Sequence, residues 1–396
     1  MRITPATELN QRCEKLQEYL RQQGVSGAVL IQNSDLFYFT GSIQQGVLYI
    51  PDTGEVVYLV RKDFGRARME SGLKHVYPLR SLRDLAGQLQ GLGITLPERL
   101  GMELDVLRVL TYQRLLKVFP AAEVVDLSTL IRKVRSVKSD YEISIMKDCA
   151  LMMDKIFQHA RGIVAVDKTD LEVAAELEFF ARKQGHQGLI RFRGFNSEMF
   201  YGHVFSGADS AVPAAVDAPL GGLGVTPAVG QGASYKKIAA GEPIIIDLIT
   251  AFDGYLVDQT RTMSVGRLPE QLRTAYFDML KIQEKLFAIA KPGVSWGAVY
   301  QQCYDLAVEM GYQENFMGSP GGQVSFIGHG IGIEVDEYPF IARGFSGQVL
   351  EENMVFAFEP KVVFPGLGAV GVENTWRVSK DGIKRLTYTD ESLLEL

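Results

Sequence analysis

The sequence predicts two domains, an α/β domain over residues 1–132 and an α+β domain with an internal repeat over residues 133–396. Three observations carry this prediction. The chain has 396 residues, which is longer than most single domains. Short β-rich runs alternate with helical patterns through the first third, as in an α/β sheet domain. Beyond it, two helices, a glycine-rich loop and an acid-bearing hairpin occur twice in the same order.

Bulk composition is that of an ordinary globular protein. Hydrophobic residues make up 46% and charged residues 22% of the chain, and the formal net charge is −6. No Lys/Arg-rich block stands out, so we expect no nucleic-acid partner. No apolar run is long enough to cross a membrane, and the N-terminus lacks the apolar core of a signal peptide. Three cysteines without a CxxC pair favour a reducing compartment, so we expect a cytoplasmic protein without membrane contact.

The N-terminal part begins with a helix. Leu9, Cys13, Leu16 and Leu20 are spaced for one apolar face, and Gly24 marks the end of the predicted helix. Strands are then expected at 27–31, 36–41, 46–50, 55–60, 76–79, 99–102 and 122–125, with helices near 63–71, 82–90 and 107–119. The acids of this part are scattered, so we interpret it as a structural or oligomerising domain.

The C-terminal part begins after a basic junction at residues 127–138. Ser139 followed by Glu142 is the pattern of a capping box, and it predicts a helix to about residue 159. Thr169 and Glu172 predict a second helix in the same way. The other expected features are a glycine-dense irregular stretch at 188–240, helices at 269–290 and 295–310, a glycine-containing loop at 317–332, and a second hairpin at 353–378.

The first hairpin is predicted from residues 241–265, where two β-rich runs flank Asp253-Gly254. An Asp-Gly pair in this position is a strong signal for a two-residue turn. Counting outward places Asp247 opposite Thr260 and Ile249 opposite Asp258, two pairs nearer the turn, so both carboxylates share a face as diagonal neighbours. On this stretch alone, two solvated acids would be the alternative interpretation.

Three further residues extend this pair. Glu359 and Glu373 fall nearly opposite each other in the second hairpin if its turn, residues 365–368, has four residues. Glu359 lies in an otherwise apolar run, so it needs a partner or a metal. His329 lies between two glycines, which would let the backbone approach a ligand closely. Four carboxylates and an imidazole suit two divalent ions, with Mn²⁺ expected first and Co²⁺, Zn²⁺ and Fe²⁺ as alternatives.

In this order and in these local motifs, the residues resemble the pita-bread metallopeptidases. The motifs are DGYLVDQTRT, GHGIG, FEP and GVEN, and they are most similar to the aminopeptidase P, prolidase and creatinase branch. The resemblance implies a creatinase-type N-terminal domain over 1–132 and a pita-bread catalytic domain with a pseudo-twofold repeat over 133–396. It implies that the metal ligands are Asp247, Asp258, His329, Glu359 and Glu373, with Asp258 and Glu373 touching both ions.

The same resemblance implies an activity. We expect a Xaa-Pro aminopeptidase or dipeptidase that cleaves the bond before proline through a metal-bridged hydroxide, and that forms a homodimer or higher oligomer. Glu359 is the candidate general base, and His329 completes the catalytic pair.

Two departures from the family pattern affect the substrate pocket. No histidine occurs between Ser206 and Asp247, where the family places one, and the nearest is His203. The family commonly has a second histidine where this chain has Asp336. We therefore interpret His203, Asp336 and Arg377 as candidate substrate-binding residues. The departures keep open a creatinase-like non-peptidase hydrolase or lyase acting on a small molecule. A non-enzymatic binding protein is a third hypothesis, against which the five retained ligands argue.

Overall fold

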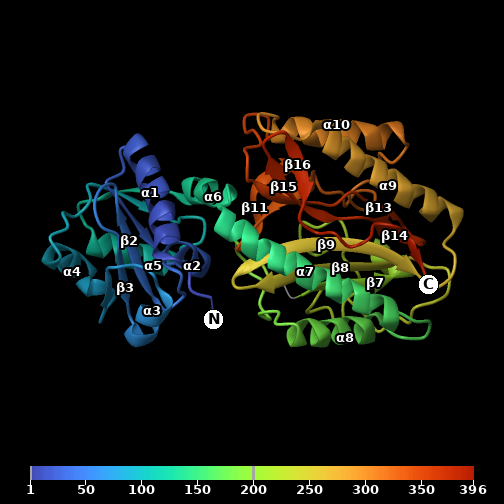
Figure 1. Ribbon diagram of the computed structural model, residues 1–396, viewed down its shortest axis with the longest axis horizontal. Helices are drawn as coiled ribbons and strands as arrows, with labels where there is room; N and C mark the ends of the chain where they lie inside the picture. Colours follow the sequence, from blue (N-terminus) through green and yellow to red (C-terminus); the bar gives the residue numbers. More distant parts are fainter. Residues whose placement is uncertain (1, 199–200) are drawn as a thin grey trace. The chain divides into compact units, whose positions relative to one another are not determined.

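The computed structural model describes residues 2–198 and 201–396, which form two compact units (Figure 1). The first unit comprises Met1–Arg135 with Arg193–Ser197, and the second comprises Ser136–Phe192 with Glu198–Leu396. The predicted domain boundary at residues 132–133 stays a prediction. Among the described helices, none combines the length and the apolar character that a membrane crossing requires.

A mixed six-stranded sheet in the order β4-β3-β2-β1-β5-β6 forms the centre of the first unit. Its strands are β1 (Gly27–Leu30), β2 (Gly46–Pro51), β3 (Val57–Val60), β4 (Val76–Pro78), β5 (Arg99–Met102) and β6 (Glu123–Asp126). Its helices are α1 (Ala6–Gln22), α2 (Asn33–Thr40), α3 (Phe64–Glu70), η1 (Leu82–Asp84), α4 (Leu85–Gly91), α5 (Val109–Val118) and α6 (Ser128–Ser136), the last of which ends at the first residue of the second unit. The sheet buries aliphatic side chains such as Val29 and Leu59 against Leu85 and Leu115.

Helix α2 replaces the strand predicted at residues 36–41, so that prediction is wrong. The Gln32 side chain accepts a hydrogen bond from the Asp35 amide at the helix start, and Gly41 ends the helix with φ 76°. Asp35 is fully buried, and Arg135 and Arg193 each donate to its carboxylate. These long-range ion pairs and the helix caps outweigh the β-propensity of the aromatic run.

The second unit begins with two helices that have the predicted caps. Capping boxes are formed by Ser139 with Glu142 and by Thr169 with Glu172, which confirms both predictions. The helices of this unit are α7 (Asp140–Ile163), α8 (Asp170–Lys183), η2 (Gly207–Ala211), α9 (Glu270–Ile289) and α10 (Trp296–Glu309). Helix α7 packs along β8 and β9 (Figure 1). Helix α9 packs on β14, and α10 packs on β11.

Among the described residues, the strands of the second unit form three sheets, in the orders β17-β9-β8-β7, β11-β10-β12-β15-β16 and β13-β14. They are β7 (Gly202–Ser206), β8 (Ile244–Phe252), β9 (Tyr255–Ser264), β10 (Phe326–Ile331), β11 (Val335–Ala342), β12 (Val355–Phe358), β13 (Lys361–Phe364), β14 (Gly368–Gly371), β15 (Asn374–Ser379), β16 (Gly382–Arg385) and β17 (Leu394–Glu395). Strand β7 lies inside the stretch predicted to be irregular, because it pairs with β8 as an edge strand. The acid-bearing strands of both hairpins therefore meet in one unit.

Candidate metal centre

The hairpin of β8 and β9 presents two carboxylates in the predicted register. Asp253 and Gly254 form the turn with φ of 46° and 89°, as a type I′ turn requires. Asp247 pairs with Thr260, and Ile249 pairs with Asp258. The structure thus confirms the predicted pairing, which places the two acids as diagonal neighbours on one face.

The second hairpin brings Glu359 and Glu373 together, although its turn is shorter than predicted. Gly368 pairs with Phe364, so the turn contains three residues, 365–367, instead of four. Phe358 is opposite Asn374 and Lys361 is opposite Gly371, which leaves Glu359 facing Glu373. With the shorter turn, Glu359 and Glu373 lie directly opposite each other, whereas the predicted four-residue turn placed them only nearly opposite.

His329 lies on strand β10, so the prediction that it belongs to a loop is wrong. It pairs with Ala357 on β12 and with Phe340 on β11. The glycines beside it allow these strands to come close. A Cβ on Gly328 would lie 2.4 Å from the Ala357 carbonyl oxygen, and one on Gly330 would lie 2.2 Å from the Tyr338 carbonyl oxygen. The close approach that these glycines allow here is to neighbouring backbone, and an approach to a ligand stays a prediction.

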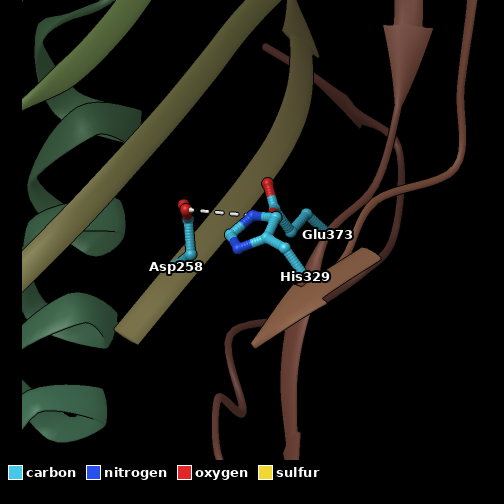
Figure 2. A group of neighbouring side chains, drawn as sticks. All are labelled: Asp258, His329 and Glu373. Carbon is cyan, nitrogen blue, oxygen red and sulfur yellow. Dashed lines mark ion pairs between the residues drawn. The ribbon is translucent and has the colours of Figure 1, made fainter. Parts of the chain in front are cut away.

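Three buried side chains from these elements point toward one another (Figure 2). Asp258, His329 and Glu373 each offer a ligand atom, and the three atoms lie within 4.8 Å of one another. The Nε2 atom of His329 is 4.0 Å from Asp258 Oδ2 and 4.0 Å from Glu373 Oε1. It is also 3.8 Å from Glu359 Oε1. The chain thus brings an imidazole and three carboxylates together from β9, β10 and the second hairpin.

Lys361 is a member of this cluster that the sequence analysis missed. Its side chain is 1% exposed, and Nζ donates to Asp247 Oδ2 at 2.9 Å and to Glu359 Oε2 at 2.6 Å. A third, longer contact of 3.3 Å joins it to Glu373 Oε2. The argument that had singled out Glu359, a charge in an apolar run, applies equally to the lysine two residues later. That signal was present in the sequence.

Thr260 and Arg261, from the DQTRT motif, hold Glu373 in place. The Thr260 hydroxyl donates to Glu373 Oε2 at 2.7 Å. Arg261 is buried, and its Nη1 donates to the Glu373 carbonyl oxygen at 2.7 Å while Nη2 donates to Asn374 Oδ1 at 2.9 Å. Both the carboxylate and the backbone of Glu373 are therefore fixed before any ligand binds, which is how outer residues orient metal ligands.

The pKa values at this centre show an excess of buried negative charge. Burial and the nearby Glu373 raise the pKa of Asp258 well above its usual range. Burial raises the pKa of Glu373 to about 7, although Lys361 pulls it down. Burial would lower the pKa of His329, but Asp336 and Glu359 outweigh it and raise that pKa. Buried groups beside uncompensated negative charge shift in these directions, and a bound cation would reverse the effect.

Two buried oxygens show where such a cation fits. Asp258 Oδ1 and Glu373 Oε1 accept no hydrogen bond from the residues that the structure describes. Leaving a buried polar atom unpaired typically costs about 1–3 kcal/mol, so such atoms usually have a ligand. Two atoms that each coordinate one ion at about 2.1 Å lie at most about 4.2 Å apart. The distances from His329 Nε2 to Glu359 Oε1, to Glu373 Oε1 and to the other Asp258 oxygen, Oδ2, are 3.8–4.0 Å and satisfy this limit.

The three candidate substrate-binding residues lie in different surroundings. His203 pairs with Asp247 across β7 and β8. Burial lowers the pKa of His203, and the opposing effect of Asp247 is smaller. Asp336 Oδ1 lies 3.4 Å from His329 Nδ1, on the side of the ring away from the other carboxylates. Arg377 donates to Asn353 Oδ1 from Nε at 2.9 Å and from Nη2 at 2.6 Å. A direct contact with substrate stays a prediction for all three.

The sequence matches two protein-family models, which together span most of the chain. Residues 144–380 match the model of metallopeptidase family M24, and residues 12–137 match the creatinase/prolidase N-terminal domain. A Xaa-Pro dipeptidase of Pyrococcus horikoshii is 28% identical over 98% of this chain and 99% of its own length.

Solved structures agree in fold. A Xaa-Pro dipeptidase from Bacillus anthracis superimposes with a TM-score of 0.83 at 28% identity, covering 98% of this chain and 100% of that chain. The X-Pro aminopeptidase of Thermotoga maritima has a TM-score of 0.79 at 23% identity, covering 96% of this chain and 100% of that chain. Both likenesses extend over nearly the whole chain, so they include both units.

Proposed function

Because the chain belongs to metallopeptidase family M24 and carries a creatinase/prolidase N-terminal domain, we propose that it is a Xaa-Pro dipeptidase that uses divalent metal. The relatives named Xaa-Pro dipeptidase support the substrate class. The observation that carries the proposal is the cluster of Asp258, His329 and Glu373, in which one oxygen of each carboxylate is buried and accepts no hydrogen bond from the described residues. A Xaa-Pro aminopeptidase, the other activity expected from the sequence, would use the same cluster on longer peptides.

Asp258, His329, Glu359 and Glu373 are the residues that would hold a divalent ion at the His329 side of the cluster. When bound, the ion supplies Lewis-acid polarisation of a carbonyl and lowers the pKa of water. The sequence predicts a second ion with Asp247 among its ligands. The number of ions stays a prediction, and the hydrogen bond that Lys361 donates to Asp247 bears on it.

Glu359 is proposed as the general base. Its Oε2 accepts a hydrogen bond from Lys361 at 2.6 Å, which leaves Oε1 facing the His329 side. Water loses a proton to Glu359 as its oxygen attacks the carbonyl carbon, and the C–N bond then breaks as the proton passes to the departing proline nitrogen. The Asp336 carboxylate lies beside His329 Nδ1, which favours a proton on that nitrogen and leaves Nε2 free to coordinate.

Two further features of the proposal follow from the sequence. We propose manganese as the bound metal, since the centre is rich in oxygen ligands with one imidazole, and metal analysis after purification without added metal identifies it. We also propose a homodimer, which sedimentation velocity tests directly.

Hydrolysis of Xaa-Pro substrates tests the activity. Protein loaded with Mn²⁺ should cleave a panel of Xaa-Pro dipeptides faster than longer peptides with the same first two residues. Asp258→Asn should lower the rate by about 10²-fold or more, because it removes a charge from the metal ligands. Glu309→Gln, which changes an exposed acid on α10, is the matched control and should leave the rate unchanged. No turnover of any Xaa-Pro substrate by metal-loaded protein would refute the proposal.

A creatinase-like hydrolase or lyase acting on a small molecule is the second candidate function. It is favoured by the absence of histidine between Ser206 and Asp247 and by Asp336, where the family commonly has histidine. Under this hypothesis the metal-loaded protein turns over small amides or amidines and ignores peptides. Cleavage of many peptides that depends on proline would exclude it.

A further inference from the structure

The ammonium group of Lys361 lies in the candidate metal centre, and all three of its N–H groups have carboxylate partners there. An ammonium has three N–H groups, and the Lys361 nitrogen contacts three carboxylates, those of Asp247, Glu359 and Glu373. The side chain is 1% exposed, so none of these contacts is shared with bulk solvent. A buried ammonium with this many charged partners is a fixed component of the centre.

The backbone around Lys361 is shaped to hold its stem. Lys361 pairs with Gly371 across β13 and β14. A Cβ on Gly371 would lie 2.5 Å from Lys361 Cγ and 2.9 Å from its Cα, so any larger residue would displace the lysine. Glu359 and Lys361 also stand two residues apart and both reach the centre. The position of the ammonium therefore follows from the strand pairing.

The oxygens of the cluster divide into two sets. Glu359 and Glu373 each direct Oε1 toward His329 Nε2, at 3.8 and 4.0 Å. The same two residues direct Oε2 toward Lys361 Nζ, at 2.6 and 3.3 Å. The two glutamates thus bridge two cation positions. The position near His329 adds Asp258, and the other adds Asp247.

We propose that the Lys361 ammonium permanently takes the second of these positions, so that each chain binds one divalent ion, at Asp258, His329, Glu359 and Glu373. The inference rests on the proposed function as a metal enzyme. It differs from the expectation from the sequence in assigning one divalent ion to each chain instead of two. A second ion would need the Oε2 and Oδ2 oxygens that Lys361 already occupies, and two cations at that distance repel strongly.

The charges of the centre agree with this assignment. One divalent ion and one ammonium leave a single excess negative charge on the four carboxylates, with a neutral imidazole. A second ion beside the ammonium would exceed the charge of these four carboxylates by one, and only the Asp336 carboxylate beside His329 would offset it. Expelling the ammonium would require a buried lysine to find another set of partners, at a cost typical of breaking a buried ion pair.

Metal counting on the full-length protein tests the proposal without any substrate. The protein is equilibrated with Mn²⁺, passed through a desalting column and analysed for retained metal per chain. We expect one ion for the wild type and a twofold increase for Lys361→Met, which keeps the stem but removes the ammonium. Lys384→Met, an exposed lysine on β16, is the matched control and should retain one ion. Two ions in the wild type, or one ion in folded Lys361→Met, would overturn the proposal.

Electron paramagnetic resonance of the Mn²⁺-loaded wild type gives an answer that does not depend on the variant folding. An isolated ion gives a simple hyperfine pattern, whereas two bridged ions give the spectrum of an exchange-coupled pair. We expect the isolated pattern, and a coupled spectrum would rule out an ammonium in the second position. Because neither readout uses hydrolysis, an inactive protein with one ion would refute the proposed peptidase function and leave this inference standing.

Discussion

The buried side chain of His186 is held in one tautomer by its hydrogen-bond partners. The amide of Gly188 donates to His186 Nδ1 at 2.9 Å, so this nitrogen carries no proton. The other ring nitrogen, Nε2, lies 3.1 Å from the Ile249 carbonyl oxygen and donates to it. Burial of this neutral ring lowers the pKa of His186 to about 4.

His186 makes the stability of the second unit depend on pH. A pKa that is lower in the folded state than in the unfolded chain stabilises the fold above about pH 6.5, and this contribution is lost as the pH falls toward about 4. Between pH 7.5 and 5 we expect the loss to be about 2 kcal/mol. The measurement is urea unfolding at both pH values, comparing wild type with His186→Gln, whose amide keeps a donor but does not titrate. An equal change in both proteins would contradict this assignment.

Glu359 and Lys361, the charged residues of the apolar run in the second hairpin, show which site residues can be recognised from the sequence. Glu359 was identifiable because a charge there needs a partner. Lys361 satisfies the same condition, but a sequence alone does not say whether its partner is a metal ligand or a surface acid. Its contact with Asp247 joins residues 114 positions apart, which only the fold brings together.

At the level of elements, strand β10 positions His329 because its glycines permit close packing on both sides. Replacing Gly330 with alanine places a Cβ 2.2 Å from the Tyr338 carbonyl oxygen, so β10 and β11 must separate. Overpacking of this kind costs about 1–3 kcal/mol, and it would also move the imidazole. We expect Gly330→Ala to lower the urea midpoint and to reduce retained Mn²⁺.

The control for this prediction is Gly347→Ala. Gly347 is exposed, and a Cβ there would meet no atom within 4 Å. Its effect on stability should stay within about 0.5 kcal/mol. If both variants behaved alike, β10 would tolerate a side chain at Gly330 and the explanation of the GHG motif would be wrong.

Elements defined by local signals were predicted well, and those defined by distant partners were not. The β8–β9 hairpin follows from Asp253-Gly254 and period-two alternation, so its register was confirmed residue by residue. The run at 36–41 has the composition of a strand, but buried ion pairs of Asp35 with distant arginines hold it as a helix. The loop predicted around His329 is a strand because β11 and β12 lie on either side of it.

On the scale of the whole molecule, the candidate metal centre takes its residues from several segments of one unit. Its side chains come from the β8–β9 hairpin, from β10 and from the second hairpin, all within the unit that begins at Ser136. A ligand that binds the folded state alone stabilises it, by about 2.7 kcal/mol at a concentration 100 times its Kd. We therefore expect divalent metal to stabilise the second unit selectively.

Tryptophan fluorescence can follow that unit by itself. The chain contains two tryptophans, Trp296 and Trp376, and both belong to the second unit. Thermal unfolding monitored at the tryptophans should shift upward with Mn²⁺ and return on adding a chelator. Asp258→Asn should show a much smaller shift. A metal-induced shift of the same size in this variant would place the stabilising ion elsewhere.

The sequence by itself determined which residues could form the centre and much of how they are presented. Turn residues, capping boxes and alternating patterns act over a few positions, so Asp247, Asp258, Glu359 and Glu373 could be assigned to hairpins from local rules. The tertiary structure alone decided that Lys361 shares the centre with these carboxylates. That outcome depends on the Lys361 ammonium reaching three carboxylates from two hairpins, and burial far from water makes those contacts decisive.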